Sequence, residues 1–424
     1  MKIAVIGAGW AGLAAAVTAT QAGHHATIFE ASRAVGGRAR ALFDTENTPP
    51  LDNGQHILIG AYTDTLRLMR TVGVDVDQTL LRIPLTLLFP NGQGLQLPAL
   101  PAPLDAFIGI LKAKGWGWRD KAALLRTAWG WQWAQFQCSS QKSVIDLCAA
   151  LTPRVMADLV EPLCVAALNT PADRSSGQVF LRVIQDSLFG DKTVQGGSNL
   201  LLPRVDLGAL FPVPAVDWLQ QHGANLMLGH RVQHLQPQEP LWRVDGSEFD
   251  YVVLACPPWE AARLVAGSGV AADAWLAQTH ALEFEAIATV YATSEARLHQ
   301  SMLSLRSDAQ NPAQFVFDRG QLGGPAGLLA FVASASQGDR QALQDAVIAQ
   351  GRTQLGLPGL QPLRTVIEKR ATFACTPGLQ RPGQCIAPGL AACGDYVDGP
   401  YPATLEGAVR SGISSAACGC RATA

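Results

Sequence analysis

Three glycines and one acidic residue near the N-terminus have the types and the spacing needed to bind a dinucleotide. Gly7, Gly9 and Gly12 form a GxGxxG pattern, and Glu30 follows it. Gly7 permits a tight turn, Gly9 lets the backbone approach a diphosphate, and Gly12 lets a helix pack closely on a strand. A carboxylate at Glu30 can accept hydrogen bonds from ribose hydroxyls and would repel a 2′-phosphate, so FAD or NAD fits better than NADP.

The flanking segments predict the elements that position these residues. Residues 2–6 are apolar and β-branched, which predicts a strand, and residues 13–22 are strong helix formers that end at Gly23. Residues 26–29 predict a second strand leading into Glu30. In this strand–turn–helix–strand unit, the N-terminus of the helix offers N–H groups to phosphates. The predicted cofactor contacts in this part are Gly7, Gly9, Trp10, Ala11, Gly12, Glu30 and Ala31.

A second glycine motif follows at Gly36-Gly37-Arg38, where it could line the diphosphate. The alternative is a glycine turn with a solvated arginine. The pattern ExxxxxGGR resembles the second element of the flavin-dependent amine oxidase and phytoene desaturase superfamily. That resemblance favours FAD over NAD as the cofactor.

The same resemblance assigns roles to three later segments. It implies that the turn containing Gly54, Gln55 and His56 faces the isoalloxazine ring, and that backbone groups at Val232 hold the adenine. Near the C-terminus, a predicted strand runs into Gly394-Asp395 and a helix follows. The Asp395 carboxylate can bind a ribityl hydroxyl, although an N-cap or turn role is the alternative, and helix amides can face the flavin pyrimidine. The predicted contacts here are Gly394, Asp395, Thr404 and Leu405.

Composition limits the class of protein. The 424 residues carry a net charge of −2, with 16% charged and 48% hydrophobic residues, so nucleic acid is not expected as a partner. No run of apolar residues is long enough to predict a transmembrane helix. The nine cysteines are scattered in apolar segments, which predicts reduced thiols in a cytoplasmic protein, and their spacing predicts no metal site.

The order of strand and helix patterns predicts an α/β fold with a Rossmann-type FAD-binding domain of the amine oxidase and phytoene desaturase type. That domain is expected in three segments, residues 1–85, 195–260 and 371–424. Residues 86–194 predict a largely helical substrate- and membrane-facing domain. Residues 261–370 predict the sheet of an inserted α+β substrate domain.

Tryptophans cluster in the predicted helical part, at Trp116, Trp118, Trp129, Trp131 and Trp133, among several basic residues. Stacking on nucleic acid is disfavoured by the nearly neutral net charge. Tryptophan and basic residues are also typical of membrane interfaces, while plain core packing is the competing interpretation. We expect a peripheral contact with the inner membrane on its cytoplasmic side.

Three further segments narrow the resemblance. Residues 51–62 (LDNGQHILIGAY), 161–171 (EPLCVAALNTP) and 202–207 (LPRVDL) are similar to segments of the bacterial hydroxysqualene dehydroxylases, also called squalene-associated FAD-dependent desaturases. The resemblance implies reductive removal of the hydroxyl of hydroxysqualene to give squalene, for hopanoid synthesis. A phytoene-type desaturase, a flavin amine oxidase and a non-enzymatic isoprenoid carrier remain alternatives.

The implied reaction needs a hydride from reduced FAD and an acid that protonates the leaving oxygen. His56, Tyr62 and Tyr401 are the candidates, in that order, and each could instead only pack against the flavin ring. Because no NAD(P)H site is evident in the sequence, we expect an external electron donor to reduce the FAD.

Overall fold

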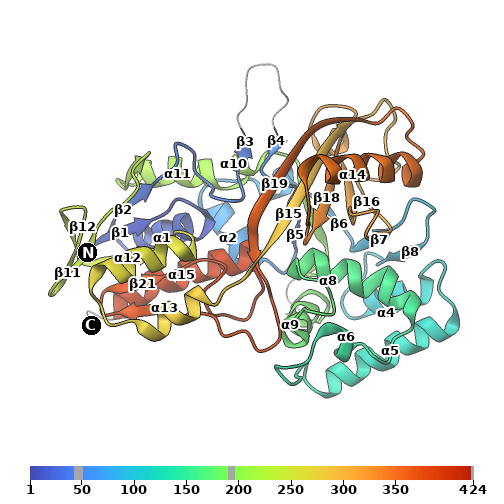
Figure 1. Ribbon diagram of the computed structural model, residues 1–424, viewed down its shortest axis with the longest axis horizontal. Helices are drawn as coiled ribbons and strands as arrows, with labels where there is room; N and C mark the ends of the chain where they lie inside the picture. Colours follow the sequence, from blue (N-terminus) through green and yellow to red (C-terminus); the bar gives the residue numbers. More distant parts are fainter. Residues whose placement is uncertain (43–50, 190–195, 422–424) are drawn as a thin grey trace.

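The structure is a computed structural model that describes residues 1–42, 51–189 and 196–421. Figure 1 shows two sheets and a group of helices, with the first sheet on the left, the second at the upper right and the helical group at the lower right. Among the described residues, no helix is long and apolar enough to cross a bilayer.

The first sheet has six strands in the order β10-β2-β1-β14-β21-β20, and all but β20 run parallel to their neighbours. Its strands are β1 (Lys2–Ile6), β2 (His25–Glu30), β10 (Asn225–Leu228), β14 (Tyr251–Leu254), β20 (Cys385–Ala387) and β21 (Leu390–Ala392). Ile6 pairs with Leu254, so the glycine turn after β1 lies beside the end of β14. The predicted Rossmann-type unit is confirmed at residues 1–30.

Helix α1 (Trp10–Gln21) is almost entirely buried, because it lies between the sheet and helices α11 (Pro212–Gln221) and α15 (Leu405–Arg421). Small side chains make this close packing possible. A Cβ on Gly412 of α15 would lie only 2.1 Å from the carbonyl oxygen of Ala11. Helices α12 (Pro258–Ser268) and α13 (Asp273–His280) follow β14.

The second sheet has five antiparallel strands in the order β16-β17-β18-β15-β19. They are β15 (Phe284–Thr293), β16 (Met302–Ser304), β17 (Phe315–Asp318), β18 (Leu328–Ser334) and β19 (Gln361–Phe373). Helix α14 (Arg340–Leu355) packs on one face through Val347, against Val290 and Phe331. The sequence indicated a sheet in this region but not β19, which extends three residues beyond the boundary expected at 370.

The helical group comprises α4 (Leu104–Lys112), α5 (Trp118–Trp133), α6 (Val144–Leu147), α7 (Pro153–Val155), the π-helix η1 (Met156–Val160), α8 (Glu161–Leu168) and α9 (Gly177–Leu188). The structure divides the tryptophan cluster. Trp116 and Trp131 are buried in the core, whereas Trp118, Trp129 and Trp133 are 75%, 72% and 85% exposed.

Short elements connect these three parts. They are β3 (Ala41–Leu42), β4 (Leu51–Asp52), β5 (Leu58–Ile59), β6 (Leu80–Ile83), β7 (Thr86–Leu88), β8 (Gly94–Gln96), β9 (Leu200–Pro203), β11 (Leu235–Gln238), β12 (Leu241–Val244), β13 (Ser247–Phe249), α2 (Thr63–Thr71), α3 (Val76–Thr79), α10 (Leu207–Leu210) and the 3-10 helix η2 (Arg319–Leu322). Residues 231–234 form a loop rather than a strand. Backbone N–H groups of Gln233 and His234 are instead bonded to the Asp245 carboxylate, and β11 begins only at Leu235.

Candidate active site

One cavity of about 820 Å³ lies between the carboxyl ends of the six-stranded sheet and the open face of the five-stranded sheet. One end is lined by glycine turns and polar side chains, and the other by apolar side chains. Most of the predicted site residues line it. They are Gly7, Gly9, Trp10, Ala11, Glu30, Ala31, Gly36, Gly37, Arg38, Gly54, Gln55, His56, Tyr62, Val232, Gly394, Asp395, Thr404 and Leu405.

Two glycine turns lie side by side at the polar end. Gly9 bridges to Gly36, and a Cβ on Gly9 would meet only the Cα of Gly37, at 3.9 Å, so the space above Gly9 belongs to the cavity. Gly12 does not line the cavity. Its Cβ would lie 2.0 Å from the carbonyl oxygen of Gly7, as expected for a glycine required by helix–strand packing.

Glu30 is held by the backbone at the nucleotide end. Its Oε2 accepts a hydrogen bond from the Ala8 N–H at 2.7 Å, and its Oε1 accepts one from the Ser32 N–H at 2.8 Å. Each carboxylate oxygen keeps a further lone pair for a ribose hydroxyl. Nearby, Arg263 donates from Nη2 to the Val232 carbonyl oxygen at 2.7 Å, which fixes the backbone where an adenine contact is predicted.

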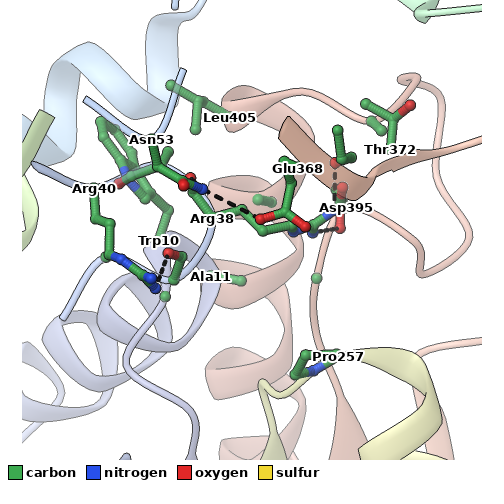
Figure 2. Close-up of a pocket in the computed structure, with 18 of the residues that line it drawn as sticks. Trp10, Ala11, Arg38, Arg40, Asn53, Pro257, Glu368, Thr372, Asp395 and Leu405 are labelled. Atoms are coloured by element: carbon green, nitrogen blue, oxygen red, sulfur yellow. Dashed lines mark hydrogen bonds and ion pairs between the residues drawn. The ribbon is translucent and has the colours of Figure 1, made fainter. Parts of the chain in front are cut away.

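Arg38 is paired with Asp395 across the cavity (Figure 2). The Arg38 Nη2 lies 2.5 Å from Asp395 Oδ1, and its Nη1 donates to the Ala371 carbonyl oxygen at 2.6 Å. The Arg38 guanidinium is therefore ion-paired rather than free in solvent, with 39% of the side chain exposed. Arg38 and Asp395 come from opposite ends of the chain and meet because β1, β14 and β21 are neighbours in one sheet.

The start of α15 completes the polar end. Thr404 caps this helix, because its Oγ1 accepts a hydrogen bond from the Gly407 N–H at 3.1 Å. Thr404 and Leu405 both line the cavity, so the positive end of a long helix faces it. Such an end stabilises an electron-rich group.

The turn at residues 52–56 is anchored to the five-stranded sheet. The Tyr291 hydroxyl donates to the Asp52 carbonyl oxygen at 3.0 Å and accepts from the Asp52 N–H at 3.2 Å. The Asp52 carboxylate accepts from the Leu207 N–H at 2.8 Å and lies 3.8 Å from Arg319. Burial raises the pKa of Asp52 to about 6, although the hydrogen bond and Arg319 oppose that rise.

His56 follows this turn and lines the cavity. Its Nδ1 lies 2.9 Å from the Gly54 carbonyl oxygen, so Nδ1 carries the proton and donates. Burial lowers the pKa of His56, with Arg38 adding to the effect against the opposing bond to Gly54. A neutral ring in this tautomer presents a lone pair at Nε2, which accepts a proton rather than donating one.

The two tyrosines that were predicted as acids lie in different places. Tyr62 lines the cavity, and burial raises its pKa, so its hydroxyl keeps its proton. Tyr401 is not among the cavity-lining residues described. Its hydroxyl donates to Asp186 Oδ2 at 2.6 Å, and burial together with Asp186 raises the pKa of Tyr401 to about 12. Because its hydroxyl donates to Asp186, Tyr401 is not positioned for the expected acid role.

The apolar end is assembled from the helical group and the five-stranded sheet. Its lining includes Val165, Ala166 and Ala167 of α8, Ile287 of β15, Phe315 and Phe317 of β17, and Val332 of β18. Asn169, in a left-handed conformation at the end of α8, joins these parts. Its Nδ2 donates to Thr372 Oγ1 at 2.9 Å and its Oδ1 accepts from the Ala335 N–H at 2.7 Å.

The cavity residues that the sequence did not identify include Asn169, Trp259 and Glu368. Asn169 lies in a segment used for the resemblance, and Trp259 directly follows the segment Ala255-Cys256-Pro257-Pro258, which comes after β14. No local sequence pattern marks Glu368 as a site residue, because it reaches the cavity only through the pairing of β19 with β15.

The lining residues fit a flavin dinucleotide. The open space over Gly9, the fixed carboxylate of Glu30 and the helix end at Leu405 provide sites for a diphosphate, a ribose and an electron-rich ring. The apolar end of the same cavity leaves room for a substrate beside the ring.

Comparison with known proteins agrees with this geometry. Residues 10–418 match the model of the family described as flavin containing amine oxidoreductase. The chain belongs to this family. It is therefore a flavin-dependent oxidoreductase, and the resemblance noted in the sequence is confirmed at the level of the superfamily.

Two relatives cover nearly the whole of this flavoenzyme. Hydroxysqualene dehydroxylase of Rhodopseudomonas palustris is 29% identical over 97% of this chain and 96% of its own length. The enzyme of the same name from Sinorhizobium fredii is 27% identical over 98% and 97%. Among solved structures, putrescine oxidase bound to putrescine has a TM-score of 0.71, with 15% identity over 99% of both chains, which shows the shared fold alone.

Proposed function

We propose that this flavoenzyme uses FAD to remove the hydroxyl of hydroxysqualene and form squalene, a step in bacterial squalene and hopanoid synthesis. The observation that carries the proposal is the full-length similarity to two hydroxysqualene dehydroxylases. The cavity supports it, because a polar nucleotide end opens into an apolar end suited to a long hydrocarbon.

Reduced FAD supplies a hydride when it is bound. The hydride replaces the hydroxyl at an allylic carbon and a proton joins the leaving oxygen, so that alcohol and reduced flavin become hydrocarbon, water and oxidised flavin. Side chains such as Phe315, Phe317 and Val332 exclude water from the reacting carbon. These apolar groups also shelter positive charge that develops on the allylic carbon as the oxygen leaves.

His56 lies in the turn that is predicted to face the flavin. Since its Nδ1 is bonded to Gly54, the Nε2 atom is the one that can contact the substrate hydroxyl. Proton donation by His56 requires a protonated ring, whereas the neutral ring orients the hydroxyl as an acceptor. A single-turnover measurement separates these roles, because loss of a proton donor slows flavin reoxidation by about 100-fold or more.

The direct test begins with the purified flavoprotein, reduced without oxygen. Addition of hydroxysqualene should reoxidise the flavin and form an equal amount of squalene, whereas squalene itself should leave the flavin reduced. His56→Ala is compared with His299→Ala, which removes an exposed histidine. Desaturation of a polyene precursor by the oxidised enzyme, with no reaction of hydroxysqualene, would replace the proposal by a phytoene-type desaturase. Amine-dependent peroxide formation would instead indicate an amine oxidase.

We also propose that the helical group contacts the cytoplasmic surface of the inner membrane. Leu104, Phe107 and Leu111 form an exposed row on α4, and Trp118, Trp129 and Trp133 form one on α5. Exposed basic residues accompany them, at Lys112, Lys114, Arg119 and Arg126. Aromatic, aliphatic and basic side chains together favour an anionic bilayer surface.

Vesicle sedimentation tests this contact. The protein should bind vesicles containing anionic lipid more strongly than neutral ones, and the double variant Trp129→Ala, Trp133→Ala should lose most of that binding. Leu228→Ala, which removes an exposed apolar side chain from β10, is the control. Equal binding by the double variant and the control would contradict the proposed face.

The flavin is proposed to be reduced by an external electron donor. Residues 267–272 (GSGVAA) contain two closely spaced glycines but provide no second dinucleotide site, because Gly267 and Ser268 end helix α12 and follow no strand. Cytoplasmic location is supported by Cys148, Cys164 and Cys393, which are buried free thiols.

A further inference from the structure

Strand β19 is irregular where it passes the cavity. Ile287 pairs with Glu368 and Glu285 pairs with Thr372, so β19 advances four residues while β15 advances two. Bulges of this kind change the direction in which side chains point, and they often lie beside active sites. Here the bulge brings Glu368 and the Ala371 carbonyl group to the cavity lining.

Glu368 is fixed at the polar end of the cavity, beside Arg38 and Asp395. Its Oε2 accepts a hydrogen bond from Asn53 Nδ2 at 3.2 Å, and its Oε1 accepts one from the Arg370 N–H at 3.4 Å. Asn53 also donates to the Arg38 carbonyl oxygen at 2.9 Å. Figure 2 shows Glu368 and Asp395 both beside the Arg38 side chain. Glu368 therefore fixes Asn53, which lies in the turn at residues 52–56 that is predicted to face the isoalloxazine ring.

Glu368 has no ion pair among the described residues. Arg38 forms its ion pair with Asp395, and it acts on the neighbouring Glu368 carboxylate only at longer range. The neighbouring cations face elsewhere. Arg40 donates to the Gly37 carbonyl oxygen at 3.0 Å, the Arg370 guanidinium lies 4.3 Å from the Trp259 ring centre, and Lys369 is exposed. Arg381 donates to the carbonyl oxygens of Asp395 and Tyr401 at 3.3 and 3.0 Å. Arg319 faces the Asp52 carboxylate, and His56 has the neutral ring described above.

We propose that Glu368 is a positioning and electrostatic residue that lowers the reduction potential of the bound flavin. A fixed negative charge near the ring opposes the addition of electrons, so the reduced flavin becomes a stronger hydride donor. This effect suits a reductive reaction, and the inference rests on the proposed function because it assumes that the flavin ring lies at the turn of residues 52–56. Asn53 transmits the positioning part of the effect.

The test is the midpoint potential of the purified holoenzyme, measured by equilibrium reduction against a reference dye. Glu368→Gln keeps the side-chain shape and removes the charge, so its flavin potential should move to a more positive value. Glu368→Asp, which retains the charge, should stay closer to the wild type. The matched control is Glu295→Gln, an identical change at an exposed site, which should leave the potential unchanged.

Asn53→Ala separates charge from positioning. It removes the hydrogen-bond partner but keeps the Glu368 carboxylate, so its potential should shift less than that of Glu368→Gln. An unchanged or more negative potential in Glu368→Gln would overturn the inference, as would equal shifts in the two variants. Failure of the wild-type protein to react with hydroxysqualene would instead count against the proposed function, because the potential is measured without substrate.

Discussion

The nucleotide end and the apolar end of the cavity are built by different means. The nucleotide end is formed mainly by backbone groups and by glycines, which have no side chain. Examples are Gly9, Gly36 and the N–H groups that hold Glu30. At the apolar end, side chains from α8, β15, β17 and β18 form the wall. A cofactor shared by a whole family can therefore be held by a constant backbone, while the substrate is selected by side chains that vary independently.

The strongest test of the backbone contribution is Gly12→Ala. The added Cβ would lie 2.0 Å from the Gly7 carbonyl oxygen and 2.9 Å from the Ala255 Cβ, so α1 could not pack on its strand. We expect no folded flavoprotein, measured by flavin content and circular dichroism. The control is Gly130→Ala in the exposed part of α5, where a Cβ meets nothing within 4 Å. It should be stabilising by about 0.5–1 kcal/mol.

The attachment of the turn at residues 52–56 to the rest of the structure is tested by Asp52→Asn. The folded pKa of Asp52 is raised from 3.8 to about 6, so between these values the folded state holds a proton that the unfolded state releases. The free energy of unfolding contributed by Asp52 is therefore present at low pH and lost as pH rises towards about 6, by roughly 3 kcal/mol.

Denaturant unfolding of both proteins between pH 4 and pH 7 measures this effect. The difference between wild type and Asp52→Asn should change with pH across that window and become constant above it. A difference that is independent of pH would show that the Asp52 carboxyl does not titrate in this range.

Gly9→Ala should separate cofactor binding from folding. Its Cβ would approach only the Cα of Gly37, at 3.9 Å, and would point into the cavity. The fold should persist while the dissociation constant for FAD rises by at least about tenfold, or about 1.4 kcal/mol. Titration followed by flavin fluorescence measures this, and unchanged affinity would place the diphosphate elsewhere.

Val332→Thr tests the apolar end of the cavity and has the smallest expected effect of these substitutions. The change keeps the shape of the side chain but puts a hydroxyl among Phe315, Phe317 and Ile287, at a cost of roughly 0.5–2 kcal/mol. We expect KM for hydroxysqualene to rise several-fold while FAD affinity is unchanged. If FAD affinity fell instead, the two ends of the cavity would not be independent.

The sequence alone determined the nucleotide end because its signals are local. A GxGxxG pattern between a strand and a helix, followed by Glu30, specifies backbone geometry over about thirty residues. The structure confirms those elements within one or two residues for β2 and within three for the start of α1. The later contacts, such as Asp395, were located by resemblance to a family motif rather than by local physics.

Tertiary structure alone decided which side chains share the cavity. Glu368 reaches it only because β19 bulges against β15, Tyr401 is directed to Asp186 by the loop before α15, and the tryptophans divide between core and surface according to which face of α5 is covered. These outcomes depend on pairing between residues far apart in the chain. Local sequence patterns do not predict such pairing, because strand register and helix docking are set by the packing of the whole chain.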